Sequence, residues 1–165
     1  LRNRGRMDPE RVEGESVVVD GFNVIITVEA ALSGALVLLC RDGCVRDIAS
    51  IHGSYRQVEE TREALVLVGE TLAELGPSRV RVFLDRPVSN SGRLRSLAMQ
   101  TAQERTWPWE VELADDPDLE LVRSQGVVAT SDGPVLDRCE RWLDLARLVV
   151  ERRLPHAWLL DLCVR

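Results

Sequence analysis

The stretch Ser16-Val17-Val18-Val19-Asp20, followed by Gly21, decides the fold class of this chain. Its valines favour an extended strand, and the run is apolar throughout, as in strands that are buried on both faces of a sheet. The Asp-Gly pair at its end is a turn signal. We therefore predict a buried strand over residues 16–20, of the kind that parallel sheets contain.

Similar signals recur along the chain and alternate with helical patterns. Strands are predicted over residues 79–85, 109–115, 127–132 and 157–162, and helices over residues 23–32, 55–75, 118–124 and 134–152. Another helix is predicted to start at Ser89 or Ser91 and to end near Arg105, and Asp42-Gly43 predicts a hairpin within residues 35–49. Strands that alternate with helices imply a mostly parallel sheet covered on both faces. We therefore expect a three-layer, Rossmann-like α/β sandwich.

The length and composition indicate one globular domain. A chain of 165 residues with 45% hydrophobic and 29% charged residues is long and apolar enough for a full core. Residues 1–15 are expected to form a polar lead-in, and residues 16–165 a single domain. We see no secretory signal and no apolar run of the ~18 residues that span a bilayer, so we expect no membrane association and a cytoplasmic location.

Several classes of function are excluded by what the sequence lacks. All 21 basic residues are arginine, which excludes P-loop nucleotide triphosphatases and Schiff-base chemistry. The motifs Gly-x-Gly-x-x-Gly and Gly-x-Ser-x-Gly are also missing. The four cysteines are interpreted as free thiols, because no second close pair of Cys or His completes a zinc site. The net charge of −6 argues against a purely electrostatic nucleic-acid clamp, but it is compatible with an acidic site that binds metal.

Aspartates stand at the ends of four predicted strands, namely Asp20, Asp85, Asp115 with Asp116, and Asp132. In a parallel sheet these ends share one edge, where open α/β sheets bind ligands. Carboxylates that converge there repel one another unless a cation is present, and their hard oxygens suit Mg²⁺ or Mn²⁺. A metal held in this way activates water and stabilises a phosphodiester in transfer. Each aspartate alone is also a favoured helix cap, and that alternative stays open.

Two ordered motifs resemble those of a known family. The first, Val18-Val19-Asp20-Gly21-Phe22-Asn23, is similar to the first strand and turn of the NYN branch of the PIN-like nucleases. The second, Asp115-Asp116 followed by a short helix and Gly126-Val127-Val128-Ala129-Thr130-Ser131-Asp132, resembles the later acidic motif of that branch. The resemblance covers roughly residues 17–139.

This resemblance implies a Mg²⁺- or Mn²⁺-dependent endoribonuclease with RNA as its partner. Asp20 would be the first-strand metal ligand, and Asn23 would help to orient water or phosphate. Asp115 and Asp116 would complete the acidic cluster, and Asp132 would be its fourth acid, with Ser131 beside it. The metal ligands expected overall are Asp20, Asp85, Asp116 and Asp132. A non-catalytic PIN-like module that binds RNA or a protein is the alternative.

Two other segments are candidates for binding. Ser89, Ser91 and Arg93 lie at a predicted helix start, where free N–H groups and a guanidinium can hold a phosphate, although an ordinary capped loop explains them equally well. Trp107-Pro108-Trp109 is interpreted as a stacking platform, as core packing or as a subunit contact. The last of these makes a homodimer one of the expected assemblies.

Overall fold

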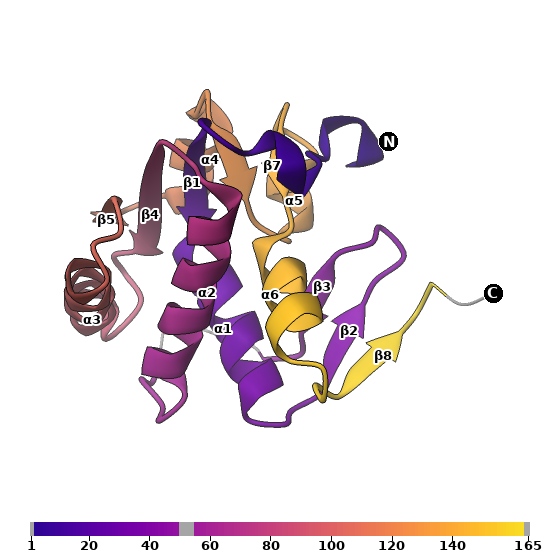
Figure 1. Cartoon of the computed structure of the whole chain (residues 1–165), viewed down its shortest axis with the longest axis horizontal. Coiled ribbons are helices and arrows are strands. Elements are labelled where there is room, and N and C mark those ends of the chain that lie inside the picture. Colours follow the sequence, from indigo (N-terminus) through magenta and orange to yellow (C-terminus); the bar gives the residue numbers. More distant parts are fainter. Residues whose placement is uncertain (1, 50–54, 164–165) are drawn as a thin grey trace.

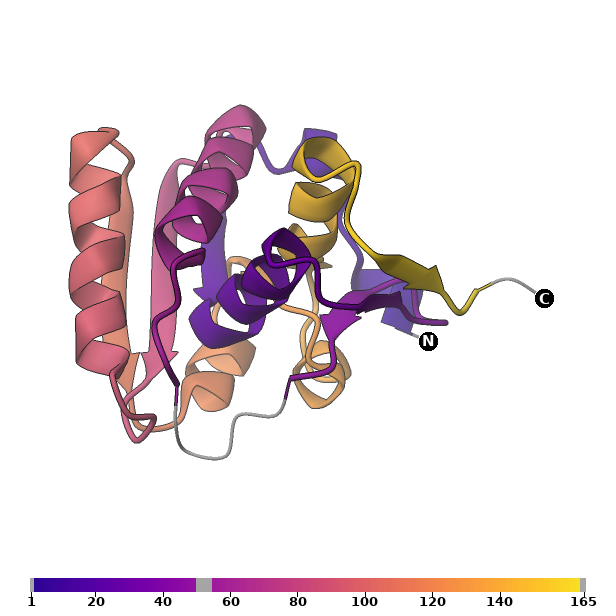
Figure 2. The same cartoon turned by 90° about the horizontal axis from the view of Figure 1, so that it is seen from below.

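A five-stranded parallel sheet forms the middle layer of the structure. The computed structural model describes residues 2–49 and 55–163. The strands are β1 (Ser16–Asp20), β4 (Arg79–Asp85), β5 (Trp109–Ala114), β6 (Val127–Ala129) and β7 (Trp142–Leu143), in the spatial order β5-β4-β1-β6-β7. All neighbouring pairs are parallel. Helices lie on both sides of this sheet (Figures 1 and 2), which confirms the predicted three-layer α/β sandwich.

The order of the strands creates a switch point beside β1. The chain runs from β1 outward through β4 to β5, and then returns to β6 on the other side of β1. Connections leave β1 and β6 in opposite directions along the sheet, so a crevice opens between their carboxyl ends. In open α/β sheets this is where ligands bind.

The two helical layers bury alternate residues of the strands. One layer holds α1 (Gly21–Leu32), α2 (Thr61–Leu75), α3 (Ser91–Glu104) and α6 (Leu145–Arg153), and the other holds α4 (Pro117–Arg123) and α5 (Gly133–Leu136). Val17 and Val19 belong to the core of the first layer, whereas Val18 belongs to the core under α4 and α5. Because side chains alternate along a strand, Asp20 lies on the same side as Val18, which is the side of α4 and α5.

A small second sheet contains the predicted hairpin. Strand β2 (Val37–Leu39) pairs antiparallel with β3 (Val45–Asp47), and β8 (Leu159–Asp161) pairs parallel with β2. The hairpin turn has Gly43 at φ 79°, and the Cys44 N–H donates to the Asp42 carboxylate over 3.2 Å. The hairpin prediction is therefore confirmed, with Gly43 in the left-handed conformation that glycine favours.

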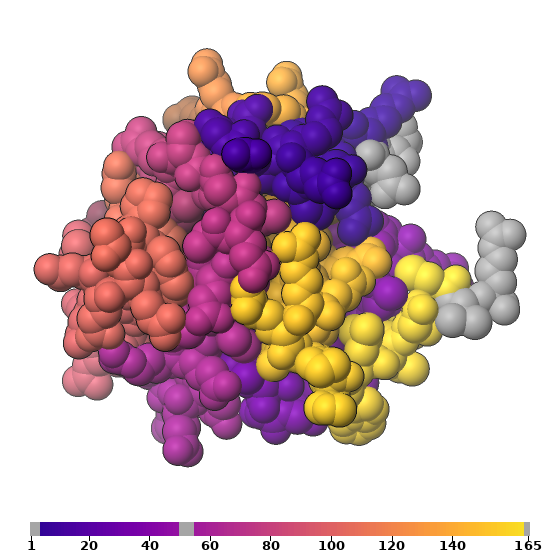
Figure 3. All heavy atoms as spheres, viewed as in Figure 1, coloured from indigo at the N-terminus to yellow at the C-terminus, as the bar shows by residue number. Residues whose placement is uncertain are grey.

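The first residues pack against the domain. They contain two short 3-10 helices, η1 (Arg2–Gly5) and η2 (Pro9–Arg11), and Val12 is fully buried in the core of the first helical layer. The Met7 N–H donates to the carbonyl of Trp142, and the Gly14 N–H donates to that of Gly76 at the end of α2. In the space-filling view these N-terminal residues lie against the surface beside α2 (Figure 3).

The predicted helix over residues 134–152 is wrong. The structure has the short α5, then strand β7, and then a new helix, α6. Trp142 and Leu143 are almost fully buried and pair with Val128 and Ala129 as an edge extension of the sheet. Asp144 then caps α6 by accepting from the Arg147 N–H over 3.0 Å. Burial of the Trp-Leu pair thus outweighs the local helical pattern.

The helix predicted over residues 55–75 begins only at Thr61. The Tyr55 carbonyl accepts from the Asn90 side chain, and the Val58 N–H donates to the Thr61 hydroxyl. Side chains, rather than other backbone groups of a helix, therefore form the hydrogen bonds of these two backbone groups.

Other boundaries shift by a few residues. Helix α1 begins at Gly21 instead of Asn23, β5 ends at Ala114, β6 ends at Ala129, and α4 begins at Pro117. The predicted serine cap of α3 is also wrong, since Asn90 in a left-handed conformation occupies the N-cap position, where its side chain makes no capping hydrogen bond. In the described residues, no helix is both long enough and apolar enough to cross a membrane.

Candidate functional site

Asp20 lies at the carboxyl end of β1, directly at the switch point. It occupies the N-cap position of α1, where the backbone N–H of Asn23 lies close enough to lower its pKa slightly but not in the geometry of a capping hydrogen bond. Instead, Oδ2 accepts from the Thr130 hydroxyl after β6 over 2.8 Å. Gly21 lets α1 begin immediately, because a Cβ there would lie 2.8 Å from the Phe83 carbonyl oxygen. The hydrogen bond from Thr130, rather than helix capping, is therefore the main polar contact of this aspartate.

Other carboxylates surround Asp20. The pKa of Asp20 is raised to about 7, chiefly by burial; the hydrogen bond from Thr130 opposes the rise, and the neighbouring Asp118 and Asp132 add to it. Burial also raises the pKa of Asp118, and after it Asp132, Asp116 and Asp85 contribute. Five aspartates come together here from β1, β4, the start of α4 and the residue before α5, and we call them the acidic edge: Asp20, Asp85, Asp116, Asp118 and Asp132.

Asp132 has an unpaired oxygen within this edge. Its Oδ1 is buried and is the one buried side-chain oxygen or nitrogen without a hydrogen-bond partner in the part of the chain that the structure describes. Like Asp20, Asp132 sits at an N-cap position but makes no side-chain cap. Its backbone N–H donates to the Thr130 hydroxyl over 3.1 Å, so Thr130 links both aspartates. Buried oxygens are almost always paired, and an orphan beside other carboxylates suits a cation.

The donor chemistry fits a hard cation, whereas the present arrangement of side chains is not a finished metal centre. Among residues 2–49 and 55–163, no group of three His, Cys, Asp or Glu side chains is placed to hold a metal ion as it stands. Carboxylates without a cation repel one another and stand apart. The fit therefore rests on the orphaned Asp132 oxygen and on the partly buried Asp20.

Asn23 and Ser131 form a clamp across the switch point. The Asn23 Oδ1 accepts from both the backbone N–H and the hydroxyl of Ser131, over 2.9 Å and 3.1 Å. Ser131 is buried, and its hydrogen bonds tie the start of α1 to the segment after β6. Both residues predicted for the site therefore lie beside Asp20, where they fix the loop that carries Asp132.

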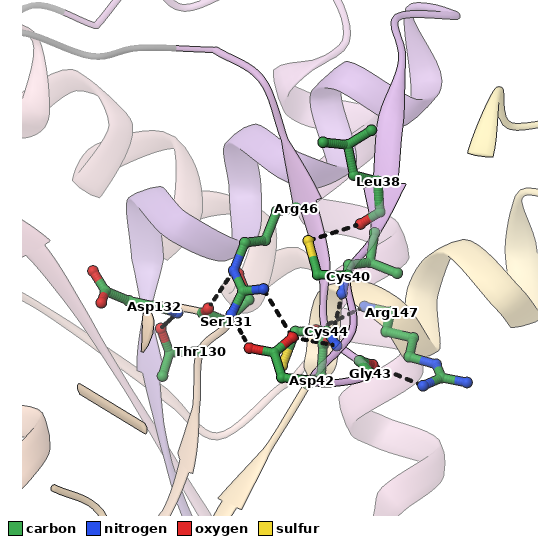
Figure 4. A network of polar contacts seen from close by, with 12 residues as sticks. Leu38, Cys40, Asp42, Gly43, Cys44, Arg46, Thr130, Ser131, Asp132 and Arg147 are labelled. Carbon is green, nitrogen blue, oxygen red and sulfur yellow. Dashed lines mark hydrogen bonds and ion pairs between the residues drawn. The ribbon is translucent and has the colours of Figure 1, made fainter. Parts of the chain in front are cut away.

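Arg46 of β3 supports the same loop from the other side (Figure 4). Its Nε donates to the Ser131 carbonyl over 2.8 Å, and its two terminal nitrogens form a two-pronged pair with Asp42 over 2.9 Å and 2.8 Å. Both side chains of the pair are largely buried. The hairpin thus holds the backbone next to Asp132.

We predict that Arg46→Lys lowers the free energy of unfolding by about 1–2 kcal/mol, since lysine keeps the charge but cannot form the fork. Urea unfolding measures this loss. The matched control is Arg81→Lys, because Arg81 pairs with one oxygen of the more exposed Glu112. An exposed pair contributes about 0–1 kcal/mol. Equal losses in the two variants would contradict the supporting role of Arg46.

The remaining predicted residues lie at or beyond the margin of the site. Asp116 caps α4 by accepting from the Leu119 N–H over 3.1 Å. The Asp115 side chain is 84% exposed and pairs with Arg86 over 2.9 Å, so it is directed to the surface. Asp85 ends β4, and burial raises its pKa, followed by Asp116 and Asp115.

The three residues predicted to bind phosphate belong to the start of α3. Ser89 and Arg93 are exposed, and Ser91 is buried with its hydroxyl donating to the Arg86 carbonyl over 3.3 Å. The Ser91 hydroxyl therefore donates its hydrogen bond to another part of the protein instead of pointing to a ligand.

Sequence reasoning missed Asp118, Thr130 and Arg46. Asp118 was visible as the third acid of Asp115-Asp116-Pro117-Asp118, and the turn of α4 places it toward Asp20 and Asp132. Thr130 belongs to the second motif, but the sequence assigns it no role. Only the pairing of β1 with β6 brings its hydroxyl to Asp20. Nothing in the sequence indicates that Arg46 reaches Ser131, since they are 85 positions apart.

Comparisons with known proteins place this chain in a family. The model of a family described as "Domain of unknown function (DUF5616)" matches residues 9–148, a range that holds the whole acidic edge and Arg46. The chain belongs to this family. It is also 33% identical over 124 residues to an uncharacterized protein, MJ0935, of Methanocaldococcus jannaschii. That match covers 75% of this chain and 59% of the relative. No solved structure matches the chain.

Proposed function

We propose that this protein is a metal-dependent endoribonuclease that holds Mg²⁺ or Mn²⁺ at the acidic edge. The observation that carries the proposal is the meeting of Asp20, Asp118 and Asp132 at the switch point, where neither Asp20 nor Asp132 has a capping hydrogen bond of ordinary geometry. Acids in this arrangement cost stability in the absence of a cation. A cost of this kind is typical of functional sites.

The residues of the chain have distinct tasks in this proposal. Asp20, Asp118 and Asp132 would hold the cation, and the Thr130 hydroxyl orients Asp20 toward it. Asn23 and Arg46 keep the Ser131 backbone in place, and with it Asp132. When bound, the cation would activate water and stabilise the charge that develops on a phosphodiester. The choice of RNA as substrate rests on the resemblance of the two motifs to the NYN branch.

A non-catalytic PIN-like module remains the second candidate. It is favoured by the lack of a preformed triple of metal-binding side chains in the described residues. Such a module would bind RNA or a protein without needing the acids. The two candidates therefore differ in their need for Asp20 and Asp132.

The deciding experiment is a calorimetric titration with Mn²⁺, followed by an RNA cleavage assay. Both are done at pH 8, where Asp20 is ionised. We expect wild type to bind Mn²⁺ and cleave RNA, and the double variant Asp20→Asn, Asp132→Asn to lose both. Asp161→Asn, an exposed aspartate of β8, is the control and keeps both. Cleavage that is unchanged in the double variant would refute the nuclease proposal, and no Mn²⁺ binding to wild type would favour the non-catalytic module.

A further inference from the structure

A polar hollow of about 550 Å³ lies on the same side of the sheet as the acidic edge. It is bounded by the end of α4, by Gly126 before β6 and by residues 138–141 before β7. Its volume is in the range of sites that bind small molecules. None of the residues of the acidic edge lines it.

Arginines dominate the charge of this hollow. Arg123, Arg138 and Arg141 line it, against one carboxylate, that of Glu140. This local excess of positive charge stands out in a chain whose net charge is −6. Guanidinium groups bind the oxygens of phosphates particularly well, because their donors form a planar fork.

Two of these arginines are available and the third is held in place. Arg123 and Arg138 are exposed, and neither has a hydrogen-bond or ion-pair partner in the part of the chain that the structure describes. Arg141 is fixed by Glu15 over 3.0 Å and by the Gln125 carbonyl over 2.8 Å. A guanidinium that is already ordered loses less entropy when it binds a ligand.

The hollow lies at the amino-terminal ends of β6 and β7, whereas the acidic edge lies at the carboxyl ends of the strands, and two helices connect these regions. Helix α4 carries Asp118 in its first turn and Arg123 at its end, so it connects the two regions. Arg138 lies near Asp118, since it lowers the pKa of that carboxyl group. The short α5 likewise joins Asp132 at its start to the segment that carries Arg138. Strand β6, which separates Gly126 at the hollow from the segment that carries Asp132, has three residues and spans about 10 Å.

We propose that this arginine-lined hollow binds the backbone phosphates of single-stranded RNA whose scissile bond lies at the acidic edge. The inference rests on the proposed function, because it assigns the substrate path of that same site. A hollow of this size takes individual nucleotides rather than a duplex. Contacts to phosphates position a strand without reading its sequence.

The test measures binding separately from cleavage. A labelled oligouridylate of about ten nucleotides, a typical site size for single strands, is titrated in EDTA and followed by fluorescence anisotropy at several salt concentrations. We expect the double variant Arg123→Gln, Arg138→Gln to bind about tenfold more weakly, and the slope of log affinity against log salt to fall by about 1.4, which corresponds to two phosphate contacts. The control Arg62→Gln, Arg105→Gln removes equal charge from the α2 and α3 side and leaves both quantities unchanged.

Each outcome separates this inference from the nuclease proposal. Weaker binding with a lower slope in the hollow variant supports the inference even if wild type never cleaves RNA. Wild type that cleaves RNA while the hollow variant binds like wild type would overturn the inference and leave the nuclease standing. A hollow that binds uridine monophosphate as tightly as the oligomer would also overturn it, because the ligand would then be a small phosphate compound.

Discussion

At pH 8, Asp20→Asn is expected to raise the free energy of unfolding by about 2–4 kcal/mol, whereas at pH 4 it changes it little. The folded protein raises the pKa of Asp20 from 3.8 to about 7. Each unit of pKa difference between the folded and unfolded states corresponds to about 1.4 kcal/mol. The full difference gives the upper end of the range, and the remaining accessibility of Asp20 lowers it.

The sign follows from where the proton is bound. Between pH 4 and pH 7 the folded state keeps a proton on Asp20 that the unfolded state has released. The contribution of this group to stability therefore falls as the pH rises from about 4 to about 7, and it is constant above that range. An asparagine carries no charge at any pH, and its carbonyl oxygen still accepts from Thr130. The stability of Asp20→Asn therefore does not fall through this titration as the pH rises.

Urea unfolding in EDTA at the two pH values measures this effect. Asp161→Asn serves as the matched control, because Asp161 is an exposed strand-end aspartate outside the acidic edge. Asp144, whose pKa burial raises to about 6, titrates alike in wild type and variant and cancels in the comparison. An Asp20→Asn variant that is less stable than wild type by the same amount at both pH values would show that Asp20 is a structural residue.

The central strands could be predicted because their local signal and their tertiary environment agree. Val17, Val18 and Val19 favour a strand locally, and burial on both faces of the sheet requires the same residues. The end of α2 was equally clear, since Gly76 takes the left-handed conformation there at φ 68°. Elements of this kind can be predicted from a sequence because the local preference and the tertiary environment favour the same structure.

The missed elements are those that depend on distant partners. Strand β7 consists only of Trp142 and Leu143, and it exists because β6 offers a free edge to pair with. The late start of α2 depends on Asn90, which binds the Tyr55 carbonyl across 35 positions. Neither partner can be identified from local periodicity.

In the candidate site, too, some features could be predicted from local sequence and others depend on distant partners. That aspartates gather at one edge follows from their positions at strand ends in a parallel sheet. All three of Asp115, Asp116 and Asp118 are exposed, and which of them lies near Asp20 depends on the packing of α4 against β1 and β4. Asp115 pairs with Arg86 at the surface, whereas Asp118 is close enough to Asp20 to raise its pKa.

Asp118→Asn is therefore expected to reduce RNA cleavage by about 100-fold, the upper range for groups that support a metal site. Asp118 is the carboxylate that most raises the pKa of Asp20 after burial itself, so in the proposed site it would share a cation with Asp20. Its replacement removes one hard oxygen ligand and weakens Mn²⁺ binding at the same time. A loss of cleavage that excess Mn²⁺ partly restores would identify the metal as the cause.

Asp115→Asn is the matched comparison, because it changes the same charge three positions earlier in the chain. Its carboxylate is mostly exposed, so we expect cleavage to stay within about twofold of wild type, as for a surface group with a weak electrostatic role. Measured rates for both variants at saturating Mn²⁺ and pH 8 test the assignment. If Asp115→Asn were the more damaging substitution, the acidic edge would have to include Asp115 and exclude Asp118, and the orientation of α4 toward Asp20 would no longer explain the site.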